Sequence, residues 1–364
     1  KSTRDYRRPS RVDFVSRIED DLGRRDFTIN ALAYDPVRSL FCDPYQGMTD
    51  LTVERIRGVR DPQERFSEDP LRMLRAVRIA SELAFSVEHK TMLAITGNAE
   101  LLGRISAERI RDELSKLLLA PSPGHILLLM HRTGLLQEIL PELTWGQGIT
   151  QGSFHRFDVL DHSLQALDNS LPRLDLRWAA LLHDVAKPVT RMEDASGIHF
   201  YGHDIEGGKL ARVILTRLRY SKQFTDKVAL LVRWHMFPVH AHSTDKALRR
   251  FIRKVGKDHV LDLMEVRRSD IIALGKQTTY AGWAHWQTLR DRLIEIIDSD
   301  AAISVSDLAI GGREVMDILD IAPGPQIGIA LEWLLEKVLD DPSLNQGAEL
   351  TALLESYQKT SFTK

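Results

Sequence analysis

Four polar residues whose side chains could together bind a nucleotide lie within one short segment near the start of the sequence, RRDFTINA at residues 24–31. The guanidinium groups of Arg24 and Arg25 can each bind two oxygens of a triphosphate. Asp26 and Asn30 can bond a ribose hydroxyl or orient an arginine. Taken alone, the segment is also typical of a charged cap on a protein surface, so a nucleotide-binding role depends on the motifs further along the chain.

A second charged group lies in EDPLRMLR at residues 68–75. Glu68 and Asp69 precede Arg72 by one helical turn, so a carboxylate and a guanidinium can lie side by side with their donors and acceptors aimed the same way. Such a pair can imitate the Watson–Crick edge of a base and select a nucleotide without a nucleic-acid template. An ordinary salt bridge is the commoner meaning of Asp-x-x-Arg by itself.

A third group consists of histidines and aspartates in the middle of the chain, where an adjacent His-Asp pair stands between more distant partners. Imidazole and carboxylate groups suit a divalent metal that lowers the pKa of a bound water. We expect the pair His183 and Asp184 to lie at one helix end, which Pro188 terminates, and to be catalytic. The candidate metal ligands are His162, His183, Asp184, His203, His235 and Asp270.

A lone histidine among apolar residues is usually a satisfied core residue. Six positions in this order favour the metal site instead. No role is assigned to the remaining histidines that we considered, which are His155, His199, His240, His242 and His259.

The composition limits the class of protein. With 43% hydrophobic and 27% charged residues over 364 positions, the chain is long enough for two or more packed domains. No apolar run approaches the roughly 18 residues of a membrane span, and the first residues lack the apolar core of a signal peptide. Cys42 is the single cysteine, which excludes an internal disulfide. We therefore expect a cytoplasmic protein with no membrane partner.

The net charge of −2 gives no overall basic field, so a nucleic-acid partner would be held by local basic patches. Each patch taken singly is more often a solvated helix face. The candidates are Arg72/Arg75/Arg78, Arg217/Arg219/Lys222 and Arg249/Arg250/Arg253/Lys254.

Helical signals dominate after residue 60. In residues 69–83 apolar side chains recur at helical spacing, with Asp69 as the expected N-cap and Pro70 as the first helical residue. A second helix is predicted to start at Ser106, where Arg109 takes the place of the Glu of a capping box. The Gly-rich segment 134–152 indicates a domain boundary.

The first residues show a different pattern, because RVDFVSR at 11–17 alternates apolar and polar positions like a strand. One strand cannot stabilise itself, so we expect that a segment precedes residue 1.

Three motifs in this order resemble the class II tRNA nucleotidyltransferase and bacterial poly(A) polymerase family, which includes the CCA-adding enzymes and their CC-adding and A-adding relatives. They are RRDFTINA, the DP-x-x-G-x-x-DL turn of residues 43–51, and EDPLRMLR. The resemblance continues through SAERI at 106–110 and through the His and Asp set, which is similar to that of HD phosphohydrolase domains. It therefore covers most of the chain.

The resemblance implies roles for the charged residues. Arg24 and Arg25 would contact the triphosphate, Asp26 and Asn30 the ribose side, and Asp69 with Arg72 the base of incoming CTP or ATP. Glu68, Arg75 and Arg78 would complete the nucleotide-binding set. The family's nucleotidyl transfer uses Mg²⁺, and its RNA partner is tRNA.

The HD resemblance implies a metal-dependent phosphohydrolase, with 2′,3′-cyclic phosphate as a candidate substrate. A divalent transition metal such as Ni²⁺ or Mn²⁺ is expected there, and His203 and His235 would hold a second ion or the phosphate.

The resemblance also implies a mostly α fold. The expected order is the remnant of an α/β nucleotidyltransferase head at 1–60, a helical neck with base recognition at 61–145, an HD domain at 146–275 and a helical C-terminal domain at 276–364. The sequence gives no oligomeric state.

One part of the family's pattern is not found. Its Gly-rich G-x-x-R-D turn and Asp-x-Asp pair, which hold two magnesium ions, should precede residue 1. GGREV at 311–315 lies too late in the chain and no carboxylate pair follows it, whereas Asp13 could supply a third carboxylate. We therefore expect the rest of the site upstream, and no nucleotide addition by these 364 residues alone.

The leading hypothesis is a template-independent tRNA nucleotidyltransferase that adds C, A or both to tRNA 3′ ends and carries an HD phosphohydrolase domain. Two alternatives stay open: a poly(A) polymerase, and a stand-alone HD phosphohydrolase whose nucleotidyltransferase remnant is only scaffold. A pure RNA-binding role fits least well, because six metal-type residues occur in register.

Overall fold

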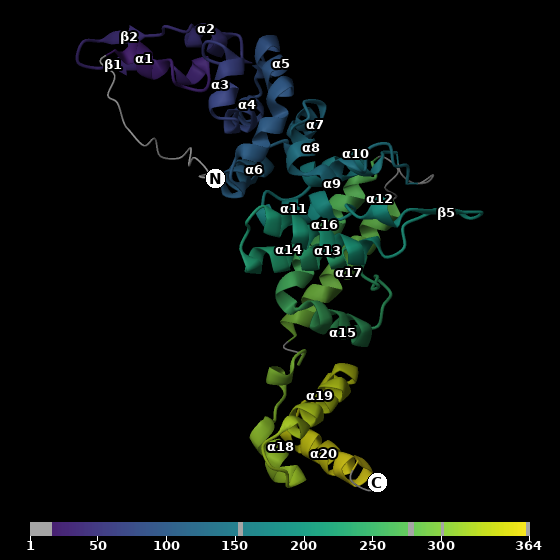
Figure 1. Cartoon of the computed structure of the whole chain (residues 1–364). Coiled ribbons are helices and arrows are strands. Elements are labelled where there is room, and N and C mark those ends of the chain that lie inside the picture. Colours follow the sequence, from purple (N-terminus) through teal and green to yellow (C-terminus); the bar gives the residue numbers. More distant parts are fainter. Residues whose placement is uncertain (1–16, 152–155, 276–279, 300–301, 362–364) are drawn as a thin grey trace. The chain divides into compact units, whose positions relative to one another are not determined.

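A computed structural model describes residues 17–151, 156–275, 280–299 and 302–361. The described chain is mostly helical, with a few short strands, which confirms the predicted fold class (Figure 1). It divides into two compact units, of which the first holds residues up to 235 together with 269–277, and the second holds 236–268 and 278 onward. No described helix combines the length and apolar character that a membrane crossing requires.

The first unit begins with short elements around a small apolar cluster of Leu22, Ala31 and Val59. They are α1 (Ile18–Leu22), η1 (Thr28–Asn30), the antiparallel pair β1 (Ala33–Asp35) and β2 (Leu40–Cys42), α2 (Gly47–Thr52), and β3 (Arg55–Ile56), which pairs in parallel with β4 (Ser86–Val87). The strand predicted over 11–17 falls, except for Arg17, outside the described residues, and so does Asp13.

The DP-x-x-G-x-x-DL turn fixes the RRDFTINA segment in place. The Asp43 carboxylate accepts hydrogen bonds from the backbone nitrogens of Gly47 (2.7 Å) and Met48 (3.0 Å) at the start of α2. Asp50 is fully buried and accepts bonds from the Thr28 hydroxyl (2.7 Å) and the Arg57 guanidinium (2.7 Å). Because Thr28 belongs to η1, its bond to Asp50 anchors the RRDFTINA segment to the DP-x-x-G-x-x-DL motif.

A series of helices comes next, and one predicted helix start needs correction. The elements are α3 (Pro62–Glu68), α4 (Leu71–Glu82), α5 (His89–Asn98), η2 (Ala99–Arg104), α6 (Ala107–Leu118), α7 (Pro123–Arg132), α8 (Leu135–Ile139) and α9 (Pro141–Thr144). α4 begins at Leu71 rather than at Pro70, because Asp69 closes α3 with extended backbone; its carboxylate still accepts a 3.3 Å bond from the Leu71 nitrogen. Ser106 is the N-cap of α6, where the helix was predicted to start, but its side chain makes no cap hydrogen bond.

The rest of the first unit is a helical bundle with one hairpin that the sequence did not lead us to predict. Its elements are α10 (Val159–Asp168), α11 (Leu174–Leu182), α12 (Lys187–Thr190), the hairpin β5 (Met192–Asp194) and β6 (Gly197–His199), α13 (His203–Arg217), α14 (Lys222–Trp234) and the last residues of α16 (Lys257–Ala273). Gly207 and Gly208 let α13 pack closely against α14, since an added Cβ would lie 3.2 Å from Val232 and 3.0 Å from Arg233. Pro188 was expected to end the helix of His183, but α11 ends before it and Pro188 lies in the first turn of α12.

The second unit contains α15 (Asp245–Val255), the start of α16, α17 (Tyr280–Asp298), η3 (Val305–Asp307), α18 (Gly312–Leu319), α19 (Pro325–Asp340), η4 (Pro342–Leu344) and α20 (Gly347–Ser361). Val315, Leu334 and Leu350 lie in its core.

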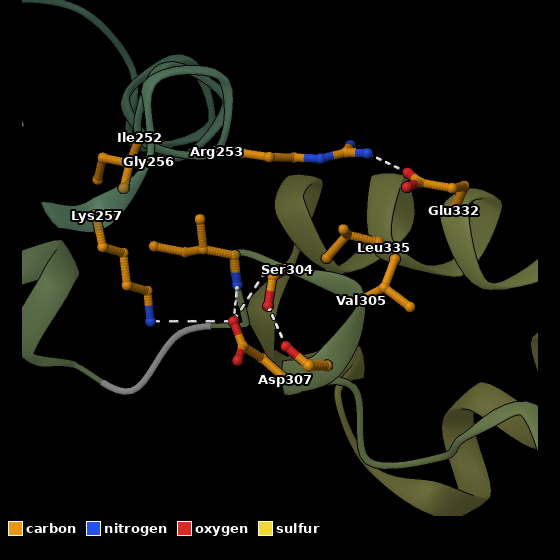
Figure 2. A pocket seen from close by; sticks show the side chains of 11 residues that line it. Ile252, Arg253, Gly256, Lys257, Ser304, Val305, Asp307, Glu332 and Leu335 are labelled. Carbon is orange, nitrogen blue, oxygen red and sulfur yellow. Dashed lines mark hydrogen bonds and ion pairs between the residues drawn. The ribbon is translucent and has the colours of Figure 1, made fainter. Parts of the chain in front are cut away.

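Most of the basic patch on α15 is neutralised within this unit. Arg250 and Arg253 form ion pairs with Glu332 and Glu336 of α19, and Arg249 donates to the Leu339 carbonyl at 2.8 Å. Figure 2 shows the cavity beside Arg253, of about 470 Å³, where Lys257 faces Asp307 at 4.0 Å. The pairing favours a structural helix face over a free phosphate-binding surface.

The packing of Gly47 against η1 can be tested by a matched pair of variants. An alanine Cβ at residue 47 would lie 2.2 Å from the Thr28 carbonyl oxygen, whereas one at Gly97 in α5 meets nothing within 4 Å. We expect Gly47→Ala to lower the free energy of unfolding by about 1–3 kcal/mol. Gly97→Ala should raise it by about 0.5–1 kcal/mol, because alanine loses less backbone entropy. Urea unfolding followed by circular dichroism measures both, and equal midpoints for the two variants would contradict the close contact.

Candidate functional site

The structure brings RRDFTINA and the α4 arginines together around one cavity of about 480 Å³. Arg25, Asp26 and Asn30 line it from the segment around η1, and Arg72 and Arg75 line it from α4. A cavity with this much positive charge and little apolar lining is suited to an anionic ligand such as a triphosphate.

Asp26 organises one side of the cavity. Its carboxylate accepts bonds from the Arg75 Nε (2.8 Å), the Asn30 amide (3.0 Å) and the Phe27 backbone nitrogen (2.9 Å). Burial alone would raise the pKa of Asp26, but these bonds and the charge of Arg75 hold it below its ordinary value. Asp26 therefore orients an arginine and an amide toward the cavity.

One guanidinium nitrogen of Arg72 has no hydrogen-bond acceptor within the described residues. The Arg72 Nη2 donates to the Arg24 carbonyl at 2.9 Å, whereas Nη1 is buried and makes no hydrogen bond within the described residues. The nearest carboxylate to Nη1, on Glu68, lies 3.8 Å away. Burial, followed by the nearby Arg65, lowers the pKa of Arg72. A buried donor without an acceptor costs about 1–3 kcal/mol, which an incoming acceptor would offset.

The Asp69 carboxylate does not pair with the Arg72 guanidinium, although the Arg72 backbone nitrogen donates to the Asp69 carbonyl at 3.0 Å. The Asp69 carboxylate pairs with Arg109 of α6 at 2.9 Å instead. Our sequence analysis missed this role of Arg109, although the signal was present, since an arginine stood where a capping box needs Glu.

The other expected nucleotide-binding residues have different neighbours. Glu68 pairs with Arg65. Arg78 bonds the buried Glu113 of α6 (2.7 Å) and Glu82 of its own helix α4 (2.7 Å). Among the described residues, Arg24, Glu68, Asp69 and Arg78 do not line the cavity.

The six candidate metal ligands converge within the first unit, although they come from five places in the chain. His162 lies on α10, His203 begins α13, and Asp270 lies near the end of α16. His183 and His235 directly follow the last residues of α11 and α14, and Asp184 follows His183. All are almost fully buried except His203 and Asp270, whose side chains are 12% and 13% exposed and so mark the open side of the site.

The ligands form two groups of three, and Asp184, a member of the second group, also faces His183 of the first. His162, His183 and Asp270 make one group, and Asp184, His203 and His235 make the other, with donor atoms in each group within 4.8 Å of one another. Asp184 Oδ2 lies 3.1 Å from the His183 Nε2, while Oδ1 lies 3.5 Å from the His203 Nε2. One carboxylate thus presents an oxygen to each group.

The imidazoles are oriented by the backbone. The Nδ1 atoms of His183, His203 and His235 lie 2.7 Å from the carbonyl oxygens of Ala180, Phe200 and Val232. A carbonyl only accepts, so each Nδ1 carries a hydrogen, and in the neutral form of each ring Nε2 then keeps its lone pair.

These lone pairs meet other nitrogens. Nε2 of His203 lies 3.3 Å from Nε2 of His235, and Nε2 of His183 lies 3.3 Å from Nε2 of His162. Facing nitrogens need a proton or a metal ion between them. The donor set and its carbonyl support therefore fit divalent metal binding.

Lys187 is a further charged residue that our sequence analysis missed. It is buried, and its ammonium donates to Asp184 Oδ2 (2.6 Å) and to the Gln151 amide oxygen (2.5 Å). Burial would raise the pKa of Asp184, but His183 and Lys187 hold it well below its ordinary value. Burial and the charge of His183 lower the pKa of His235 to about 3, so that imidazole is neutral and able to bind a metal.

Comparison with known families gives three matches along the chain. The "Poly A polymerase head domain" matches residues 1–57, the "Probable RNA and SrmB-binding site of polymerase A" matches 84–145, and the "HD domain" matches 155–303.

Similar proteins cover most of the chain. It is 38% identical to an A-adding tRNA nucleotidyltransferase of Deinococcus radiodurans over 89% of this chain and 76% of that protein. It is 34% identical to a CC-adding tRNA nucleotidyltransferase of Thermus thermophilus over 88% of this chain and 73% of that protein. Among solved structures, the CCA-adding enzyme of Bacillus stearothermophilus in complex with CTP matches with a TM-score of 0.69 and 26% identity, over 95% of this chain and 76% of that one.

Proposed function

The chain belongs to the class II tRNA nucleotidyltransferase family, and we propose that it takes part in adding C, A or both to tRNA 3′ ends from CTP and ATP. The observation that carries the proposal is the cavity where Arg25, Asp26, Asn30, Arg72 and Arg75 converge. Similarity to A-adding, CC-adding and CCA-adding proteins favours tRNA over poly(A) synthesis.

In this proposal the arginines bind the triphosphate and Asp26 keeps Arg75 aimed at it. Asn30, whose amide is held by Asp26 at 3.0 Å, lies where it can meet the ribose. We propose Mg²⁺ as the ion for the transfer step, because it binds phosphate oxygens. Within the described residues, Asp26 is the only carboxylate that lines this cavity, and it already pairs with Arg75. The roles proposed for the cavity residues therefore do not depend on Mg²⁺.

We propose that Asp69 and Arg72 read the base, with Arg109 as a positioning residue. Arg109 holds the Asp69 carboxylate at 2.9 Å while the Arg72 Nη1 lacks a hydrogen bond, so the base edge would find one preset acceptor and one available donor. Glu68, Arg24 and Arg78 then support this arrangement without lining the cavity.

The activity is tested with the product of the complete gene and a tRNA that lacks its 3′ CCA. Supplying CTP and ATP separately and together distinguishes CC addition, A addition and full CCA addition by the length of the product. Repeated AMP addition to RNA without tRNA structure would instead indicate a poly(A) polymerase.

Base reading gives a prediction for nucleotide selection. Asp69→Ala removes a hydrogen bond to a charged partner, worth about 1.5–3 kcal/mol, so the preference for CTP and ATP over UTP and GTP should fall roughly 10- to 150-fold. Arg109→Ala should lower the same preference by a smaller factor, since the acceptor is loosened but present. Calorimetric binding of the four nucleotides measures the preference.

The matched control is Asp112→Ala, which removes an exposed carboxylate from α6, the helix of Arg109, where it pairs with Arg111. It should leave nucleotide preference unchanged. An unaltered preference in Asp69→Ala would refute the base-reading role.

For the second site we propose a metal-dependent phosphohydrolase. His162, His183 and Asp270 would hold one divalent ion, and His203 and His235 a second, with Asp184 shared between them. A transition metal such as Mn²⁺ or Ni²⁺ suits this nitrogen-rich set, and when bound it supplies a water of lowered pKa. Lys187 keeps Asp184 charged and oriented through the 2.6 Å bond to Oδ2.

The shared carboxylate gives a prediction for metal binding. Titration of chelator-treated protein with Mn²⁺ should show two binding events. His203→Ala should remove one event and spare the other, whereas Asp184→Ala should weaken both. His125→Ala, at an exposed imidazole of α7, is the control and should change neither.

The alternative is a polar core whose histidines only bond one another. Two unchanged binding events in Asp184→Ala would place the ions elsewhere and contradict the site. Loss of phosphoesterase activity in Asp184→Ala with nucleotide addition retained would separate the two activities.

We further propose the domain bounds 1–60, 61–145, 146–275 and 276–364 for head, neck, HD domain and C-terminal domain. A cytoplasmic location is the one expected for an enzyme with a tRNA substrate.

A further inference from the structure

We propose that Tyr201, backed by His199, is a stacking platform for the base of a nucleotide whose phosphate lies in the HD site. The proposal rests on the phosphohydrolase function proposed above and names its substrate class: a phosphoester carried by an unpaired nucleoside, such as an RNA 3′ end.

The platform is an aromatic pair with one face open. The rings of His199 and Tyr201 are stacked, with centroids 5.2 Å apart and planes 10° from parallel. His199 covers one face of the tyrosine ring, yet Tyr201 as a whole is 69% exposed. A tyrosine ring in water with a free face is suited to stacking on a base.

Side chains of the β5–β6 hairpin hold the His199 ring of this pair in position. The His199 Nε2 lies 2.7 Å from the hydroxyl of Ser196, in the β5–β6 turn, and 3.3 Å from Asp194, at the end of β5. The Ser196 hydroxyl in turn donates to Asp194 at 2.5 Å. These bonds hold the imidazole in place, so the tyrosine rests on a fixed surface and little ordering is needed on binding.

The platform is tied to the open side of the metal-ligand cluster. Phe200 precedes Tyr201; its carbonyl lies 2.7 Å from the His203 Nδ1, and its ring lies 5.5 Å from the ammonium of Lys187. Gly202 has a left-handed φ of 75° and turns the chain from Tyr201 into α13. Two Cα steps of about 3.8 Å join Tyr201 to His203, so their α-carbons lie close enough for one nucleotide to span the two residues.

The surrounding segment has the character of a binding surface. Val189, Met192 and Ile205 are also exposed large apolar side chains within the stretch that contains the hairpin. Exposed apolar groups beside a polar site are typical of ligand-binding surfaces.

The test compares two non-hydrolysable ligands, an adenosine 3′-phosphonate and the same sugar phosphonate carrying a methoxy group in place of adenine. Calorimetry is done on the Mn²⁺-loaded protein with CTP in excess to fill the nucleotide cavity. The wild type should bind the adenine ligand about 5- to 30-fold more tightly than the baseless one. Tyr201→Ala should bring this ratio close to one without changing the affinity for the baseless ligand, and Tyr201→Phe should keep it.

The control is Tyr34→Ala, which removes another exposed tyrosine, from the β1–β2 hairpin, and should leave the ratio unchanged. The baseless ligand serves as the internal check that the site is folded. A ratio near one in the wild type, or one that survives Tyr201→Ala, would overturn the platform while leaving the phosphohydrolase proposal standing. Equal weakening of both ligands in Tyr201→Ala would indicate a purely structural role and overturn the platform too. Failure of both ligands to bind the wild type would overturn the phosphohydrolase proposal as well.

Discussion

The buried carboxylate of Asp184 is the constraint on which the helical part of the first unit depends. Asp184 is 2% exposed, and an isolated buried charge costs several kcal/mol unless it is paired. Its compensation comes from imidazoles on separate segments and from the Lys187 ammonium. Satisfying this one charge therefore fixes the ends of α11 and α14 and the start of α13 in a single place.

Two further carboxylates, in the N-terminal part of the unit, also join separate segments through the groups that compensate their charge. Asp50, fully buried, joins η1 to the strand β3 region through Thr28 and Arg57, and Asp26 joins η1 to α4 through Arg75. Each carboxylate connects segments that, within the described residues, belong only to short strands and separate helices. The residues that we propose for function are thus also the ones that specify the local fold, so a substitution at Asp26 or Asp184 acts on both.

The sequence was a good guide where chemistry is set by residue type and order. It predicted that Arg25, Asp26 and Arg72 would meet and that His162 and Asp270, over a hundred positions apart, would join His183; the structure brings them together. The sequence did not predict hydrogen-bond partners that only tertiary packing brings together. Arg109 bonds Asp69 across two helices, and Lys187 owes its burial to Asp184 and Gln151, which periodicity does not encode. The β5–β6 hairpin was missed because three-residue strands carry too short an alternation to recognise.

The position of the histidines at helix ends explains why an adjacent His-Asp pair works as a ligand set. The last carbonyls of a helix lack intrahelical partners, and those of Ala180 and Val232 take the Nδ1 hydrogens of His183 and His235. Each helix end thereby satisfies its own backbone, fixes which nitrogen donates to the carbonyl and turns Nε2 toward Asp184. In the middle of a helix the same carbonyls would already be bonded, so the orientation would have to come from a further side chain. The fold obtains two oriented ligands from backbone groups that it had to satisfy in any case.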